Sequence, residues 1–143
     1  MNKYINYFIY IIKHKYYVFL ECFKMGLILH AFTHDLSKFM PSEFIPYAIK
    51  FYGNKPITEE IKINFEIAWL LHQHRNKHHW DFWINSQGIA ITMPKKYIMH
   101  MIADWRGMSR VFGDTAKDFY EKNKIKMNLH TKTIELIYEE LMP

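Results

Sequence analysis

The spacing of apolar residues constrains the fold of this chain more than any other feature. Apolar side chains recur mostly three and four residues apart, and runs that alternate apolar and polar residues are sparse. The first spacing is typical of helices with one buried face, whereas alternation is typical of strands. The sequence therefore predicts an all-α protein.

Start and stop signals divide this pattern into about six or seven helices. Thr58 precedes Glu59 and Glu60, which is typical of a capped helix start with acidic residues in the first turn. Gly113 is a typical helix stop. The predicted helices cover, in order, residues 3–24, 27–36, 40–53, 58–74, 94–111, 115–121 and 131–142, and residues 75–88 are predicted to form an irregular connection.

Composition indicates one domain with its own core. Half of the 143 residues are hydrophobic, and no linker or internal repeat interrupts the chain, so residues 1–143 are expected to form a single helical domain. The single cysteine, Cys22, excludes an intramolecular disulfide and a cysteine-rich zinc module. We therefore expect Cys22 to be a small buried apolar residue and the protein to be cytoplasmic.

Neither a membrane nor a nucleic acid is indicated as a partner. The apolar stretch Tyr4–Ile12 is too short to span a bilayer and runs into a basic segment, so it is predicted to be a core helix, with a peripheral membrane helix as the alternative. The net charge is +5, but the lysines are scattered. The one basic cluster, Lys122–Asn128, is explained equally well by a solvated surface turn, so net charge alone does not indicate a nucleic-acid partner.

Nine histidines are distributed unevenly along the chain, at positions 14, 30, 34, 72, 74, 78, 79, 100 and 130. In an all-α chain, the ligands of one metal must come from different helices. From His14 the chain runs about 12 residues, or roughly 18 Å of helix, to Gly26, and it returns by about 8 residues, or roughly 12 Å, to His34. An antiparallel hairpin would therefore bring His14 close to His34 and Asp35.

Asp104 is a further candidate for the same place. It lies in an apolar helical segment, which puts it in the buried face or at its edge. A buried carboxylate needs a partner or a cation. The sequence leaves open whether Asp104 forms a salt bridge, caps a helix or binds a metal.

These residues resemble a known pattern. His14, His34-Asp35 and Asp104 are similar to the H…HD…D signature of the HD-domain superfamily of metal-dependent phosphohydrolases. The stretch HKYYVFLEC resembles the first helix of that superfamily, and HDLSK resembles its HD-x-x-K box.

A closer resemblance covers nearly the whole chain. The motifs HDLSKFMPSEFIPY, AWLLHQHRNKHHWDFW and ADWRGMSRVFGDTAKDFYEKNK are similar to an uncharacterised family of bacterial and phage proteins, domain of unknown function 5662. This resemblance implies a bacterial protein or a phage product in the host cytoplasm. The resemblance to this uncharacterised family implies no activity, so a mechanism must be inferred from the superfamily and from the residues themselves.

The superfamily resemblance implies a metal centre in an HD-like helical domain. The two histidines and two aspartates of the signature would hold a divalent metal ion. Some HD proteins bind a second ion with extra histidines between the HD pair and the last aspartate, and here that interval contains His72, His78 and His79. The alternative for this histidine-rich stretch is a solvated helix terminus. The expected cofactor is one or two ions of Mn, Fe, Co, Zn or Mg, since imidazole and carboxylate ligands do not select among these metals.

Further residues are assigned roles in catalysis and substrate binding. Asp35 would bridge the two ions, and an ion-bound water would be the nucleophile. Lys38, about one helical turn further on, would stabilise charge on a phosphate; the alternative is a surface lysine. Asn76, Arg75 and Arg106 are weaker candidates for substrate contacts.

Six other side chains are given more ordinary roles. Trp80 and Trp83 flank the histidine cluster and would belong to the core or wall the pocket, where they could stack on a base. The remaining histidines are expected to be structural or surface residues; these are His30, His74, His100 and His130.

The leading hypothesis is a metal-dependent hydrolase of a nucleotide or another small phosphoester. A second hypothesis is an HD-type di-iron oxygenase that resembles inositol oxygenase, because that enzyme uses a similar two-metal set of ligands. A third is a non-catalytic protein that keeps the fold and binds a nucleotide or a partner protein.

Overall fold

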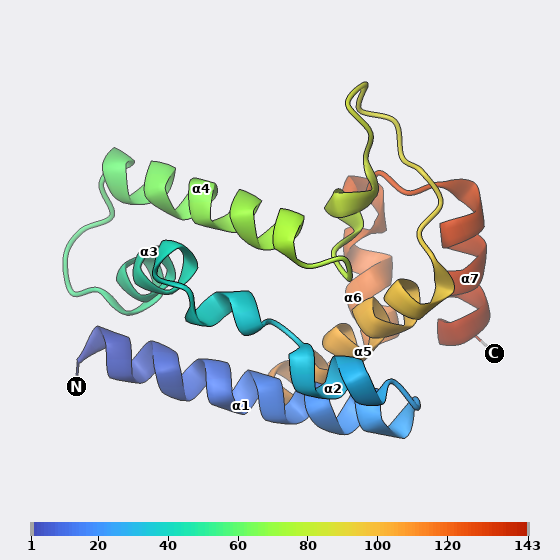
Figure 1. Cartoon of the computed structure of the whole chain (residues 1–143), viewed down its shortest axis with the longest axis horizontal. Coiled ribbons are helices and arrows are strands. Elements are labelled where there is room, and N and C mark those ends of the chain that lie inside the picture. Colours follow the sequence, from blue (N-terminus) through green and yellow to red (C-terminus); the bar gives the residue numbers. More distant parts are fainter. Residues whose placement is uncertain (1, 143) are drawn as a thin grey trace.

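The computed structural model describes residues 2–142, and within that range it confirms the all-α, single-domain prediction (Figure 1). It contains seven α-helices and three short 3₁₀ helices over the described residues. Their bounds are α1 (Lys3–Lys24), α2 (Ile28–Thr33), η1 (Leu36–Phe39), α3 (Pro41–Tyr52), α4 (Glu59–Arg75), η2 (Trp80–Trp83), α5 (Lys95–Phe112), α6 (Ala116–Asn123), η3 (Lys124–Lys126) and α7 (Thr131–Leu141).

The long helix α1 forms the base of the molecule, and its buried face organises the rest. In Figure 1, α3 and α4 lie over its N-terminal half, α2 doubles back along its C-terminal end, and α6 and α7 lie at the far end of the molecule. Ile11, His14 and Val18 all belong to the buried face of α1. Their spacing of three and four residues places them on one side of a helix. A histidine thus occupies a core position between two apolar residues.

Three apolar clusters surround the place where these helices meet. The first lies between α1, α3 and α4 and includes Tyr7 and Tyr47. The second lies between α1, α2 and α5 and includes Cys22, which is a buried free thiol as expected. The third joins α5, α6 and α7 and includes Trp105 and Tyr120. The polar centre described below is therefore held between separately packed pieces of core.

Gly107 allows α1 and α5 to pack very closely. A Cβ atom at this position would lie 2.7 Å from Cγ2 of Val18 and 3.0 Å from its backbone nitrogen. Backbone atoms cannot yield as a flexible side chain can. The absence of a side chain at Gly107 therefore sets the separation of the two helices that carry His14 and Asp104.

One predicted boundary near the metal-ligand candidates was wrong. The helix predicted over residues 27–36 ends at Thr33, because His34 is extended and Asp35 adopts the left-handed conformation, with φ 52° and ψ 30°. The connection predicted over residues 75–88 contains η2, and an isolated bridge joins Ile84 to Ala90. Among the described residues, no helix is both long enough and apolar enough to cross a bilayer.

Candidate metal centre

Four side chains from three parts of the fold converge on one point. Nε2 of His14, on α1, lies 2.9 Å from Nε2 of His34, which follows α2. Oδ1 of Asp104, on α5, lies 3.3 Å from the first of these nitrogens and 3.5 Å from the second. Oδ2 of Asp35 lies 3.4 Å and 3.3 Å from the same two nitrogens. We call His14, His34 and Asp104 the first group.

Asp35 also faces a second set of donor atoms with its other oxygen. Oδ1 of Asp35 lies 3.5 Å from Nε2 of His72 and 3.3 Å from Nε2 of His78. Nε2 of His79 lies 2.9 Å from Nε2 of His72. We call His72, His78 and His79 the second group. All seven residues that were predicted as metal ligands therefore meet in one centre, and Asp35 turns one carboxylate oxygen to each group.

The conformation of Asp35 makes this bridging position accessible. Over the described residues it is the one residue other than glycine with a positive φ. The left-handed turn ends α2 and starts η1, and it points the buried carboxylate between the two groups. Unusual backbone conformations of this kind cluster at functional sites.

A fully buried carboxylate supports the second group from behind. Oε2 of Glu43 accepts a hydrogen bond from Nδ1 of His72 at 2.9 Å. Ser37 and Arg75 also donate to Glu43, at 3.0 Å and 2.8 Å. Burial opposes the charge of Glu43, but the bonds from His72 and Arg75 lower the pKa of its carboxyl. Because Nδ1 of His72 carries the hydrogen, Nε2 keeps a free lone pair that faces the centre.

A neutral side chain supports the first group in a similar position. Nδ1 of His34 lies 2.9 Å from Nε2 of His100, which is 5% exposed. If Nδ1 of His34 donates this hydrogen bond, its Nε2 is free to bind an ion. His100 also contacts His78, with ring centroids 4.3 Å apart. His100 was expected to be structural or on the surface, and it lies next to the centre.

Burial keeps the imidazoles of His34, His78 and His79 in their neutral form. It holds the pKa of His34 and of His78 well below the usual range and lowers the pKa of His79 to about 3. Burial opposes the charge of Asp35, but His34 and Lys38 hold the pKa of its carboxyl below the usual range, whereas burial raises the pKa of Asp104. Neutral imidazole is the form that binds metals.

The unpaired atoms and the distances of the centre fit a bound cation. Within the described chain, both carboxylate oxygens of Asp35, Oδ1 of Asp104 and Nε2 of His78 are buried without a hydrogen-bond partner. Buried polar atoms normally have one. Bonds of about 2.1 Å to one cation would place neighbouring donor atoms about 3.0–3.4 Å apart, close to the separations in the first group. The donor set suits a divalent transition metal or magnesium.

Lys38 brings a fixed positive charge to the edge of the centre. Its Nζ lies 2.7 Å from Oδ2 of Asp35 as an ion pair, without the geometry of a hydrogen bond. Burial alone would lower the pKa of Lys38, but Asp35 and Asp104 raise it above its ordinary value. The side chain is therefore a cation at neutral pH.

Two pockets lie beside the centre. The larger has a volume of about 700 Å³, and we call it the aromatic pocket; it is lined by Tyr7, Tyr10, Lys38, Tyr47, Phe51, Tyr52, Phe65, Glu66, Trp69 and Phe112. The smaller, of about 290 Å³, is the narrow pocket. It is lined by His78, His79 and Asp104, and also by Asp81 and Asp114. Trp69 and Phe112 line both pockets, so these two side chains separate them.

The three weaker candidates for substrate binding are held by contacts within the protein. Asn76 donates to Ser37 at 2.7 Å and lies beside His72, and Arg75 donates to Glu43. Arg106 donates to Glu140 at 2.9 Å.

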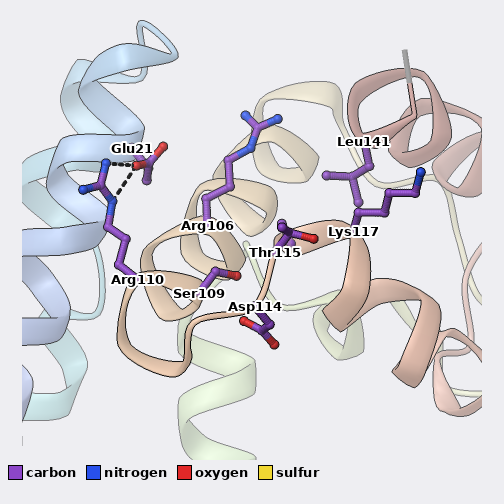
Figure 2. A pocket seen from close by; sticks show the side chains of 9 residues that line it. Glu21, Arg106, Ser109, Arg110, Asp114, Thr115, Lys117 and Leu141 are labelled. Atoms are coloured by element: carbon purple, nitrogen blue, oxygen red, sulfur yellow. Dashed lines mark hydrogen bonds and ion pairs between the residues drawn. The ribbon is translucent and has the colours of Figure 1, made fainter.

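Arg106 is not brought to the centre. It lines a separate pocket of about 490 Å³. Figure 2 shows it there with Ser109, Thr115 and Lys117, and with Arg110 paired to Glu21.

The remaining histidines and tryptophans that the sequence analysis singled out belong to neither group of the centre. His30 packs against His100, with ring centroids 4.7 Å apart, and His74 is exposed. His130 caps α7. Trp80 lines the narrow pocket, and Trp83 packs against the apolar cluster of α5.

Two residues of the centre were missed, and one of them had a signal in the sequence. His100 lies four residues before Asp104, so a single helix places both on one face. Glu43 lies in the first turn of α3, where an acidic residue is typical of any helix start. Nothing in its immediate context indicates a partner on α4.

Comparison with known proteins gives a family and no activity. Neither a curated protein nor a solved structure shows significant similarity to this chain. One family model matches residues 3–143, which is nearly the entire sequence. The chain therefore belongs to the family of unknown function DUF5662.

Proposed function

We propose that this protein is a metal-dependent phosphohydrolase with a two-ion centre. One observation carries the proposal: Asp35 turns one carboxylate oxygen to each of two groups of histidine and carboxylate side chains, with the ammonium of Lys38 beside it. Bridging carboxylates with imidazole ligands on both sides are typical of two-metal hydrolytic sites. The H…HD…D order of His14, His34-Asp35 and Asp104, which resembles the HD-domain superfamily, supports the same reaction.

The residues of the chain would divide the work of hydrolysis between them. The first group, the second group and Asp35 would hold two divalent ions, which supply a Lewis acid and lower the pKa of a coordinated water. Water oxygen forms a bond to phosphorus, the ester P–O bond breaks, and the water proton ends on the leaving alcohol, giving an alcohol and inorganic phosphate. Lys38 would offset the charge that develops on the phosphate oxygens.

The test joins metal content to activity. The full chain is purified, its metals are measured, and it is loaded with Mn²⁺, Fe²⁺ or Co²⁺ and assayed on a panel of phosphomonoesters for released phosphate. We expect hydrolysis that Asp35→Asn abolishes and that Asp118→Asn, at an exposed position on α6, leaves unchanged. Loaded protein that releases no phosphate from any substrate contradicts the proposal.

A second candidate is an oxygen-activating enzyme. It is favoured by the composition of the first group, because two histidines and one carboxylate are the ligands of many non-haem iron oxygenases. Consumption of oxygen by the iron-loaded protein, with no phosphate released by the manganese-loaded protein, would select this candidate.

A further inference from the structure

The aromatic pocket has an unusual wall. Apart from Lys38 and Glu66, every side chain that lines it is aromatic. Its volume of about 700 Å³ is in the range of small-molecule sites. Flat aromatic walls favour a flat ring in the space between them, since rings gain contact area by offset stacking.

Three residues of this wall contact three residues of the metal centre. Tyr10 stacks on His14 of the first group, with ring centroids 6.2 Å apart and an angle of 8° between the rings. Trp69 stacks on His72 of the second group, at 5.7 Å and 25°. Lys38 pairs with Asp35. A molecule in the aromatic pocket therefore lies one side chain away from a ligand of each group and next to the ammonium of Lys38.

Two tyrosines of the wall have hydroxyls without a partner. Tyr7 is 1% exposed and Tyr47 is 6% exposed, and neither hydroxyl makes a hydrogen bond within the described chain. Their rings stack on each other at 5.8 Å. Phenylalanine would fill the same space without a buried polar atom. Buried hydroxyls normally have a partner, so these two point to polar atoms of a ligand.

The charges of the two pockets decide which one receives the substrate. The narrow pocket carries Asp81 and Asp114 in addition to the ligands of the centre, and these carboxylates repel a phosphate. The aromatic pocket has one carboxylate, Glu66, and one cation, Lys38, whose ammonium lies beside Asp35. A phosphoester thus fits with its phosphate at Lys38 and its organic part in the aromatic pocket.

We propose that the aromatic pocket binds a ring-bearing phosphoester, with a heteroaromatic ring stacked between its side chains and hydrogen-bonded to the hydroxyls of Tyr7 and Tyr47. This rests on the proposed function and narrows its substrate class. Tyr7 and Tyr47 are then specificity-determining residues, whereas the metal ligands act on every phosphoester alike.

The experiment compares two substrates that differ only in the ring. Adenosine monophosphate and ribose phosphate share the sugar and the phosphate, and the metal-loaded full chain is assayed on both. We expect kcat/KM to be about 100-fold higher for adenosine monophosphate, as stacking plus two hydrogen bonds allow. Equal kcat/KM for the two substrates would overturn the proposal.

Removal of each hydroxyl sharpens the comparison. Tyr7→Phe and Tyr47→Phe should each lower kcat/KM for adenosine monophosphate by about tenfold, mainly through KM, and leave ribose phosphate unchanged. Their melting temperatures should not fall, because the hydroxyls have no partner in the protein. Tyr16→Phe, at an exposed position of α1, is the matched control. An equal loss of kcat/KM on both substrates would contradict the assignment.

A binding measurement separates this proposal from the proposed function. If the loaded protein releases no phosphate from any phosphomonoester, the proposed function fails, and calorimetric titration with adenosine monophosphate then tests whether the aromatic pocket binds it. Binding that is weakened by Tyr47→Phe and not by Tyr16→Phe supports the aromatic pocket. Absence of binding, or equal binding to both variants, overturns it.

Discussion

The first group is assembled from residues far apart along the chain, whereas the second group comes from the single stretch His72–His79. His14 and Asp104 meet only because α1 packs on α5. The ligands of the second group all lie at the end of α4 and in the loop after it. The first group therefore reports on the tertiary fold, and the second depends on one segment whose local opening would release all its ligands.

The two groups also differ in charge and in their support. Around Oδ2 of Asp35 the first group adds a carboxylate and two imidazoles, whereas around Oδ1 the second group adds three imidazoles. The anionic Glu43 supports the second group, and the neutral His100 supports the first. Carboxylates favour harder cations and imidazoles favour softer ones, so the two positions should prefer different metals.

The largest effect should come from the residue that the groups share. Asp35→Asn keeps the size of the side chain and suits the left-handed backbone, but it removes the charge that faces both groups. We expect loss of both ions and a fall in kcat/KM of roughly 10³-fold or more, as several kcal/mol of transition-state stabilisation disappear. Elemental analysis and phosphate release measure the two effects. Retention of either ion would mean that Asp35 does not bridge.

Single substitutions in each group should remove one ion and leave the other. Asp104→Asn should abolish binding at the first group, and His79→Ala should do so at the second. Each should lower kcat/KM by about 10²-fold or more if the reaction needs both ions. His74→Ala, at an exposed histidine of α4, is the control. If either variant loses both ions, the two groups form one inseparable site.

Lys38 lies on the side of the first group and should affect only that group. Lys38→Met removes the ammonium that a cation must compete with at Oδ2 of Asp35. The first ion should bind more tightly and the second unchanged, while kcat/KM falls by about 10²-fold because phosphate charge is no longer offset. Lys62→Met, on the exposed surface of α4, is the matched variant. Weaker binding of the first ion would contradict this arrangement.

Substitutions of Glu43 and His100, which hydrogen-bond to ligands of the two groups, should weaken the binding of the two ions by different amounts. Glu43→Gln removes the charge behind His72 and should weaken the second ion by about 10- to 100-fold. His100→Gln removes a neutral partner of His34 and should weaken the first ion less. Stepwise metal titration by calorimetry measures both, with Glu60→Gln at an exposed position as control. Equal effects of the two substitutions would show that the charge of the supporting residue does not matter.

The smallest effect on chemistry should come from the packing of the helices. Gly107→Ala forces α1 and α5 apart and should lower the free energy of unfolding by about 1–3 kcal/mol. The first ion should bind more weakly, since His14 and Asp104 separate, and the second ion should not change. Urea unfolding and metal titration test this, with Ser109→Ala on α5 as control. Weaker binding of the second ion would show that the change in packing of α1 and α5 also moves α4.

Helix geometry predicted only the part of the first group that lies on the hairpin, and the placement of Asp104 beside it came from the resemblance to the HD-domain superfamily. Counting residues from His14 to the turn and back predicted the meeting with His34, and the apolar neighbours of Asp104 predicted its burial. The second group was predicted from a resemblance and a high density of histidines, since no rule places loop side chains.

What the sequence did not predict lies in contacts between elements. Glu43 and His72 are far apart along the chain, and the angle between α3 and α4 decides whether they meet. The end of α2 at Thr33 was missed because no strong stop residue marks it in the sequence. The tertiary environment of Asp35 ends that helix.

The left-handed conformation of Asp35 narrows the choice of residue at this position in two independent ways. The backbone readily accepts glycine, asparagine and aspartate, and it disfavours a longer side chain such as glutamate. The proposed bridge between two ions accepts only a carboxylate, because two anionic oxygens must point in different directions. Aspartate alone satisfies both demands, so neither a chemically conservative nor a conformationally conservative replacement can substitute for it.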